Sequence, residues 1–274
     1  MIDVLLDFAQ KAGAEMEKRQ KNLHLQKNKD KTVCSVVTEV DIYVSDLFAE
    51  TIEKHFSTLN YMIIDEEKIE QYGKDIFKKI NESEYQFVID PIDGTILYTN
   101  WLPLYGITIG VYKKGKPLIG LIYLPETREL AYCDKKAYYV TETFTENQVI
   151  TELKPQTHSQ SPIIFGHAWK WRLKKGYNIE KALFLNFFSA VSQSIYTLVG
   201  KSKAYCMYMH LWDMAGVLPI AQYLGMKIFE YGTDRVYDCI SAQYFDDEMM
   251  MKKHCILCYP QDYAEICDMV EPVL

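Results

Sequence analysis

The sequence lacks the features of several protein classes. Its 274 residues include only 13 glycines and 9 prolines, and its seven cysteines follow no regular spacing. These counts exclude a collagen-like repeat and a disulfide-rich small domain. No apolar run approaches the roughly 18 residues of a membrane-spanning helix, and the first residues carry aspartates where a signal peptide is basic. We therefore expect reduced cysteines in a cytoplasmic protein with no membrane segment.

Positive charge is also scarce. The 30 Lys and Arg residues stand against 37 Asp and Glu, which gives a formal net charge of −7. Nucleic-acid binding depends on clustered basic residues, so this balance argues against a nucleic-acid partner. The 49% hydrophobic and 24% charged residues are typical of a folded domain. We expect a folded chain that attracts cations.

Hydrophobic periodicity predicts both helices and strands. Apolar residues recur at helical spacing over 4–16 and 42–52. Short apolar runs between turn signals predict strands at 61–64, 85–89, 108–112, 118–123 and 129–133. Most of these runs are joined by short turns, which favours a largely antiparallel sheet in the first part of the chain.

A polar, threonine-rich segment at 140–161 is the predicted linker between two halves. The expected division is an N-terminal α+β half, 1–145, and a C-terminal α/β half, 146–274. In the second half we predict a strand at 163–165, helices at 189–199 and after Asp213, and a strand followed by a helix over 255–269. Cys255 and Cys258 are compatible with a redox or zinc pair, but their apolar run favours a buried strand.

The stretch 90–95, Asp-Pro-Ile-Asp-Gly-Thr, follows an apolar run and carries the densest chemistry in the sequence. Two carboxylates at the end of a rigid strand can bracket hard divalent cations, which prefer oxygen ligands. Gly94 allows a close backbone approach to an anion, and amides near Thr95 could hold phosphate oxygens. The same residue types also form ordinary strand-to-helix turns.

Three further acidic spots lie near predicted element ends. The triplet Asp-Glu-Glu at 65–67 follows a strand and could be a solvated turn. Thr38 and Asp41 precede the second helix, where either could cap it. Asp213 precedes an apolar helical stretch and taken alone is an N-cap.

Together and in this order, the four motifs resemble the inositol monophosphatase family of lithium-sensitive, Mg²⁺-dependent phosphatases. The family pattern T-x-x-D, G-E-E, D-P-[IL]-D-G-T and W-D-x-A occurs here at 38–41, 66–67, 90–95 and 212–215. The resemblance covers nearly the whole chain. It implies a layered αβαβα sandwich of the sugar-phosphatase type and a homodimer.

The resemblance also implies roles for individual residues. Two or three Mg²⁺ ions would be held by Glu66, Asp90, Asp93, Asp213 and the carbonyl of Ile92. Asp41 and Thr95 would orient and deprotonate the attacking water, with support from Glu67, so that a phosphate monoester is hydrolysed directly. The substrate would lie beside Asp93, Gly94, Thr95, Ser189, Ala190, Met207 and Asp213.

Departures from the family pattern lie on the substrate side. Phe188 stands where the family commonly has a small residue, Asp65 replaces a glycine, and 205–208 contains no acid. Pro219 should kink or shorten the helix after Asp213. The substrate therefore stays open among small phosphorylated metabolites. The alternatives are 3′(2′),5′-bisphosphate nucleotidase, fructose-bisphosphatase-like and histidinol-phosphatase-like activities, or a non-catalytic binding protein on the same fold.

Aromatic and basic residues alternate over 167–175, a pattern that could stack a nucleobase and hold a second phosphate. We favour a solvated face with its tryptophans packed inward. Lys31 lies where the family often has a basic residue near the metals, but a solvated lysine is the favoured interpretation. For His210 we favour a structural role.

Overall fold

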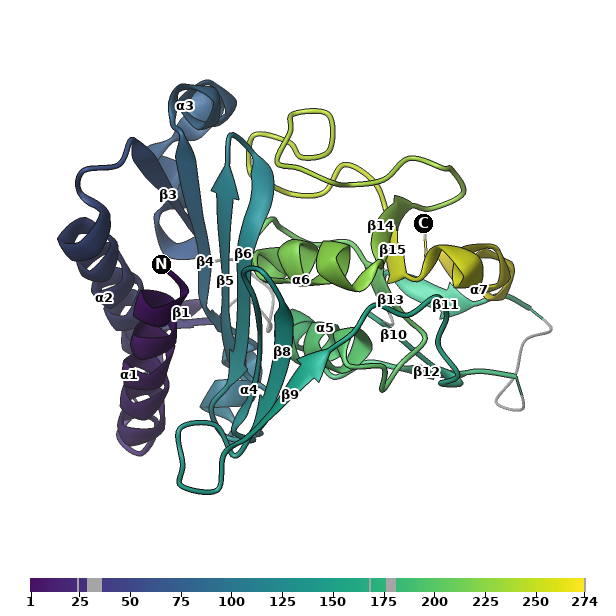
Figure 1. The fold of residues 1–274 in the computed structure, drawn as a ribbon, viewed down its shortest axis with the longest axis horizontal. Helices are drawn as coiled ribbons and strands as arrows, with labels where there is room; N and C mark the ends of the chain where they lie inside the picture. The colour runs from purple at the N-terminus through teal and green to yellow at the C-terminus, as the bar shows by residue number, and fades with distance from the viewer. Residues whose placement is uncertain (24, 29–35, 168, 176–180, 274) are drawn as a thin grey trace.

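The computed structural model describes residues 1–23, 25–28, 36–167, 169–175 and 181–273. Its elements form five layers (Figure 1): two helices, a large sheet, two central helices, a smaller sheet and a final helix. This is the αβαβα arrangement that the family resemblance implied. Its helices are α1 (Ile2–Gln20), α2 (Glu39–Phe56), α3 (Ile76–Glu82), α4 (Thr95–Thr99), α5 (Ala190–Leu198), α6 (Val217–Leu224) and α7 (Tyr263–Met269). Short 3₁₀ turns are η1 (Glu66–Gln71), η2 (Gly73–Asp75), η3 (Trp212–Met214) and η4 (Pro260–Asp262).

The large sheet has the order β3-β4-β5-β6-β7-β8-β9. Only the β3–β4 pair is parallel, so the sheet is largely antiparallel, as predicted. Its strands are β3 (Tyr61–Asp65), β4 (Tyr85–Asp93), β5 (Gly106–Lys113), β6 (Lys116–Leu124), β7 (Glu129–Cys133), β8 (Ala137–Thr141) and β9 (Val149–Leu153). All five strands expected between 61 and 133 are present.

The linker prediction needs a correction, because the segment 140–161 contains β9. This strand pairs with β8 from Ala137–Leu153 to Thr141–Val149. The large sheet therefore continues past the expected boundary at residue 145, and the connection to the second sheet begins after Leu153. A polar composition misled the prediction, since β9 is an edge strand whose residues are mostly exposed.

The smaller sheet has the order β12-β10-β13-β15-β14, with the first three strands parallel and the last two antiparallel to their neighbours. Its strands are β10 (Ile163–Gly166), β12 (Leu183–Leu185), β13 (Ala204–Met207), β14 (Lys227–Glu230) and β15 (Cys255–Cys258). Cys255 and Cys258 are buried on β15, and burial raises the pKa of both thiols. The prediction of a buried structural strand is confirmed. Two small ribbons pair β1 (Leu25–Asn28) with β2 (Val36–Thr38), and β11 (Trp171–Leu173) with β16 (Val270–Pro272).

The helices follow from their apolar faces. The outer pair, α1 and α2, buries one stripe each against the large sheet, and the rings of Phe8 and Phe48 meet at 5.1 Å between centroids. The central pair, α5 and α6, lies between the two sheets (Figure 1), so nearly every residue is buried. Pro219 lies in the first turn of α6, where its missing N–H removes no helical hydrogen bond. The proline therefore lies at the start of the helix and does not interrupt it.

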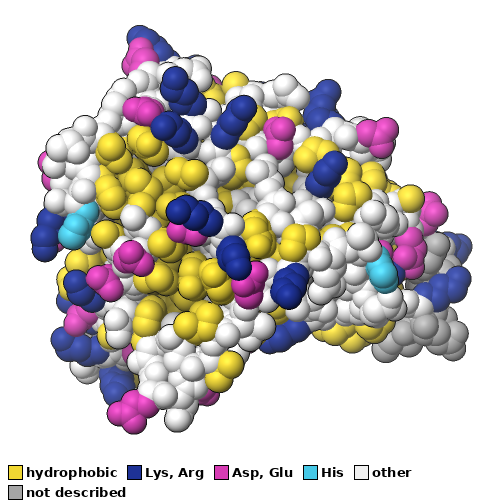
Figure 2. Space-filling view, in the orientation of Figure 1, with side chains coloured by type: hydrophobic (Ala, Val, Ile, Leu, Met, Phe, Trp, Pro, Cys, Tyr) yellow, Lys and Arg dark blue, Asp and Glu magenta, His cyan; other side chains and the backbone are white. Residues whose placement is uncertain are grey.

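The face in Figure 2 mixes acidic, basic and apolar side chains, with no large field of one charge sign. Within the described ranges, no helix combines the length and apolar character that crossing a bilayer requires.

Candidate metal and phosphate site

A bulge in β4 directs two carboxylates to the same face of the sheet. Asp90 pairs with Thr108 and Asp93 with Gly106, so three steps on β4 match two steps on β5. Residues three apart point to opposite faces of a regular strand, but one extra residue restores the same face. The spacing D-x-x-D therefore places both carboxylates on one face because the strand bulges between them.

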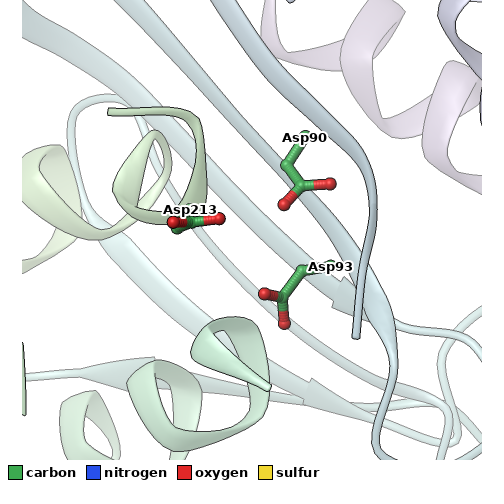
Figure 3. Close-up of side chains that lie close together, drawn as sticks. All are labelled: Asp90, Asp93 and Asp213. Carbon is green, nitrogen blue, oxygen red and sulfur yellow. The ribbon is translucent and has the colours of Figure 1, made fainter. Parts of the chain in front are cut away.

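The third carboxylate comes from a segment more than 100 residues away. Asp213 lies in η3, and its side chain points toward those of Asp90 and Asp93 (Figure 3). One oxygen from each of the three lies within 4.8 Å of the others. Asp213 Oδ2 also accepts a hydrogen bond from the backbone N–H of His210 at 2.8 Å, which fixes its orientation.

Close backbone packing brings η3 onto the sheet. A Cβ at Gly110 would lie 2.1 Å from the carbonyl oxygen of Ala215, so only glycine fits there. Two buried hydrogen bonds hold the contact: Tyr112 Oη donates to the Ala215 carbonyl at 2.9 Å, and the Gly216 N–H donates to Thr108 Oγ1 at 2.9 Å. The position of Asp213 is thus set by the sheet itself.

The electrostatics of the three acids indicate a cation site. Burial, followed by the charges of Glu66, Asp93 and Asp213, raises the pKa of Asp90 well above its usual value. Burial and the Asp213 charge raise the pKa of Asp93 to about 7. Asp90 Oδ1 is buried and has no hydrogen-bond partner among the described residues. Such a group is costly unless a cation neutralises it, and carboxylate oxygens are the donors that Mg²⁺ prefers. The residues present therefore fit divalent metal binding.

Asp93 also connects the sheet to the central helix α5. Its carboxylate accepts hydrogen bonds from the Ser189 hydroxyl and from the N–H groups of Ala190 (3.1 Å) and Val191 (2.9 Å). Ser189 and Ala190, expected beside the substrate, contact this carboxylate and are buried. Gly94 follows at φ +79°, and a Cβ there would meet Ser189 Cβ at 3.2 Å.

Asp41 and Thr95 meet at the edge of the site. Thr95 Oγ1 lies 3.2 Å from Asp41 Oδ1 and 2.8 Å from the Ile92 carbonyl oxygen. Asp41 also closes a capping box with Thr38 at the start of α2, so the capping role and the predicted catalytic position coincide. Burial raises the pKa of Asp41 to about 6, although the hydrogen bonds from Thr38 lower it.

Asp65 has a role that the sequence did not reveal. It is fully buried, accepts a hydrogen bond from Ser45 Oγ at 2.6 Å and accepts another from the Glu67 N–H at 2.9 Å. These bonds fix the start of η1, where Glu66 turns into the pocket. The residue that replaces the family glycine therefore positions a predicted metal ligand. A short polar residue directly before a turn was the available signal.

The acids open into a cavity of about 200 Å³. Seven of the predicted site residues line it: Glu66, Asp90, Ile92, Asp93, Gly94, Thr95 and Asp213. The other lining residues are Val36, Ile96, His167, Trp169 and Phe188. Met207 requires a correction, because it is fully buried in the core on β13 and does not line the cavity. Lys31 lies outside the described residues.

An aromatic wall, which we define as His167, Trp169 and Phe188, forms one part of this cavity. The rings of Trp169 and Phe188 lie 5.3 Å apart between centroids, and those of His167 and Trp169 lie 5.2 Å apart. Burial lowers the pKa of His167 to about 4, which keeps its ring neutral. The prediction of inward-packed tryptophans holds for Trp171, which is fully buried, and is wrong for Trp169, which is half exposed. His210 stacks on Trp212 at 4.5 Å.

The fold and the site together define a layered α/β protein with a buried acidic metal site between its two sheets. The family model for the inositol monophosphatase family matches residues 1–256. The chain therefore belongs to the inositol monophosphatase family.

Individual relatives are more distant. The chain is 26% identical over 249 residues to the Nus factor SuhB of Vibrio cholerae, covering 85% of this chain and 87% of that protein. It is 30% identical over 130 residues to the Nus factor SuhB of Pasteurella multocida, and this match spans only 45% of the relative's length. An IMPase/NADP phosphatase solved with Mg²⁺ and phosphate shares the fold, with a TM-score of 0.71, 15% identity and coverage of 97% of this chain and 92% of that one.

Proposed function

We propose that this chain is a Mg²⁺-dependent phosphatase that hydrolyses a phosphate monoester of a small metabolite. The observation that carries the proposal is the meeting of Asp90, Asp93 and Asp213 within 4.8 Å in a cavity that Thr95 also lines. Membership of the inositol monophosphatase family supports it, as does a solved neighbour that holds Mg²⁺ and phosphate.

In this proposal the three aspartates, Glu66 and the Ile92 carbonyl would hold two or three Mg²⁺ ions. When bound, the metal supplies Lewis-acid chemistry: it acidifies water and offsets charge on the phosphate and leaving oxygens. The cavity is polar on this side, and buried carboxylates repel an anion unless cations are present. Phosphate binding and metal binding are therefore coupled at this site.

The protein's own proton acceptor would be Asp41, acting through Thr95. The Thr95 hydroxyl bridges the Asp41 carboxylate and the Ile92 carbonyl, so it can pass a proton from water in the cavity to Asp41. A carboxyl with a pKa near 6 is well suited to a general base near neutral pH. Glu67, whose N–H donates to Asp65 beside the predicted ligand Glu66, would support the same water or metal ion. No protein nucleophile is required, so the substrate phosphate is attacked directly by water.

Several finer assignments belong to the same proposal. We propose that the protein is a cytoplasmic homodimer, that each chain is one unit of two halves, and that lithium inhibits the enzyme, as the family resemblance implies. The substrate candidates are inositol phosphates, sugar bisphosphates, histidinol phosphate and nucleotides. The solved neighbour named an IMPase/NADP phosphatase adds weight to the nucleotide group.

The test is a phosphate-release screen over these four groups, with and without Mg²⁺ and with added Li⁺. The wild type should release phosphate only with Mg²⁺, Li⁺ should inhibit it, and Asp93→Asn should abolish it. Asp134→Asn, which changes an exposed acid directly after β7, is the matched control. The relatives named Nus factor SuhB support the alternative, which is a non-catalytic binding protein on the same fold. If the folded wild type releases no phosphate from any compound, the binding role replaces the phosphatase.

A further inference from the structure

We propose that the aromatic wall selects phosphate monoesters whose leaving group carries a flat aromatic ring, as a nucleoside does. This inference rests on the proposed function and names its substrate class. It assigns a specificity-determining role to Trp169 and Phe188, which no sequence motif of the phosphate site includes.

The wall adjoins the acid cluster through the chain itself. Phe188 directly precedes Ser189, whose hydroxyl donates to Asp93. The same cavity that contains the three aspartates is lined by His167, Trp169 and Phe188. A phosphate held at the acids would therefore have its leaving group beside these rings.

The rings of Trp169 and Phe188 lie at the exposed side of the cavity and not in the core. The exposed fractions of Trp169 and Phe188 are 49% and 47%, whereas Trp171, two residues away, is fully buried. Half-exposed apolar rings that touch one another beside a polar cavity mark a ligand surface. An aromatic side chain can stack on any flat aromatic ring, because every such ring has a π-face.

The backbone of Phe188 is strained to hold this ring in place. Its φ is +57°, a region that favours glycine and disfavours a bulky side chain. The Asn186 side chain stabilises the conformation by accepting a hydrogen bond from the Phe188 N–H at 2.8 Å. Strain that local bonds maintain in a cavity is typical of functional positions.

Three of the four Lys and Arg residues of 167–175 do not point to a second phosphate. Lys170 Nζ lies 4.8 Å from the centroid of the Tyr208 ring, Arg172 pairs with Glu271 at 2.8 Å, and Lys174 Nζ donates to the Cys267 carbonyl at 2.6 Å. These cations are held by the protein's own groups. The selected feature is therefore the ring, and a bisphosphate should gain no advantage over a monophosphate.

The test compares kcat/KM for adenosine 5′-monophosphate and ribose 5-phosphate, which share the ribose 5-phosphate unit and differ at C1, where one carries the base and the other a hydroxyl. We expect the wild type to favour the nucleotide by about tenfold or more. Phe188→Gly, which also relieves the strained φ, and Trp169→Ala should each lower this ratio by about tenfold. Trp101→Ala removes an exposed tryptophan that lines a different pocket and should leave the ratio unchanged.

Two further substrates define the selected chemistry. Activity toward phenyl phosphate should fall in Phe188→Gly as activity toward the nucleotide does, and a loss confined to one of the two substrates would overturn selection of flat rings in general. Adenosine 3′,5′-bisphosphate should match the monophosphate. The proposal is overturned if both wall variants keep the wild-type ratio, or if they reduce both substrates of the matched pair equally.

A binding measurement separates this inference from the phosphatase proposal. Adenosine should quench tryptophan fluorescence saturably in the wild type and bind at least about tenfold more weakly to Phe188→Gly. If no phosphate is released from any compound but this binding is observed, the phosphatase proposal fails and the ring-binding wall stands. If phosphate is released but adenosine does not bind, the wall proposal fails alone.

Discussion

The acidic side and the aromatic side of the cavity are held in different ways. Asp90 and Asp93 are buried at a bulge of a central strand, and Asp93 accepts three hydrogen bonds from α5. Trp169 and Phe188 are half exposed and lie outside the helices and strands. A side chain held in the core cannot be substituted without disturbing the fold, whereas a ring on a loop can be substituted with little effect elsewhere. In our proposals, the phosphate chemistry therefore depends on the buried scaffold and the substrate preference depends on the exposed loops.

The largest effect should come from the Thr95 hydroxyl, which joins the Asp41 carboxylate to the Ile92 carbonyl. Thr95→Ala removes the bridge between Asp41 and the Ile92 carbonyl, so we expect phosphate release to fall about 100-fold or more. Thr95→Ser keeps the hydroxyl and should stay within several-fold of the wild type. Equal activity of the alanine and serine variants in a steady-state assay would remove Thr95 from the proposed proton path.

A second large effect should come from the contact that positions Asp213. Gly110→Ala places a Cβ against the Ala215 carbonyl, so the free energy of unfolding should fall by about 1–3 kcal/mol, and the displaced Asp213 should reduce activity. Gly73→Ala is the matched control, because nothing lies within 4 Å of its Cβ and only its φ of +52° is strained. Urea unfolding and phosphate release measure both. If Gly110→Ala is fully active, the sheet does not set the position of Asp213.

An intermediate effect concerns pH and Mg²⁺. The pKa of Asp93 rises from 3.8 to about 7 on folding and that of Asp41 to about 6. Because these values are raised, the stability that the protonated acids contribute is lost as pH rises through about 6 to 7. Mg²⁺ offsets the resulting repulsion, so the gain in Tm on adding Mg²⁺ should be larger at pH 8 than at pH 5. Titratable groups outside this cavity contribute alike with and without metal. A gain independent of pH in differential scanning fluorimetry would contradict this account.

The smallest effect should be on the aromatic side. Phe188→Gly and Phe188→Ala both remove the ring, but only alanine keeps the strain of a positive φ. The glycine variant should therefore be more stable than the alanine variant by about 1 kcal/mol. Urea unfolding of the pair measures this difference. An alanine variant as stable as the glycine variant would show that position 188 carries no strain.

Periodicity was enough to predict much of the scaffold. The patterns at 4–16 and 42–52 predicted α1 and α2, and the short apolar runs between turn signals predicted β3 to β7. The pattern is informative here because the two helices bury one face each, while the central strands β4 to β6 are buried on both faces and give apolar runs. The polar edge strand β9 was not predicted, because a strand with little buried surface has no apolar run.

The candidate site, like the fold, was predicted from the sequence only in part. The motif at 90–95 located two acids, but their common face depends on a bulge, and the approach of Asp213 depends on Gly110, 103 residues earlier in the chain. Long-range contacts of this kind leave no local signal. Trp169 and Trp171 are two residues apart and chemically identical, yet one lies at the cavity and the other in the core. Trp171 lies on β11, which pairs with β16, whereas Trp169 lies in the turn before that strand.

The most direct test of the central claim is phosphate release by Asp90→Asn in saturating Mg²⁺. The substitution keeps the size of a side chain whose oxygen is buried at the centre of the acid cluster. We predict that activity falls by about 100-fold or more, while the variant without Mg²⁺ is at least as stable as the wild type, because one repelling charge is gone. A folded Asp90→Asn variant with activity within several-fold of the wild type would contradict the assignment of these acids as the catalytic metal site.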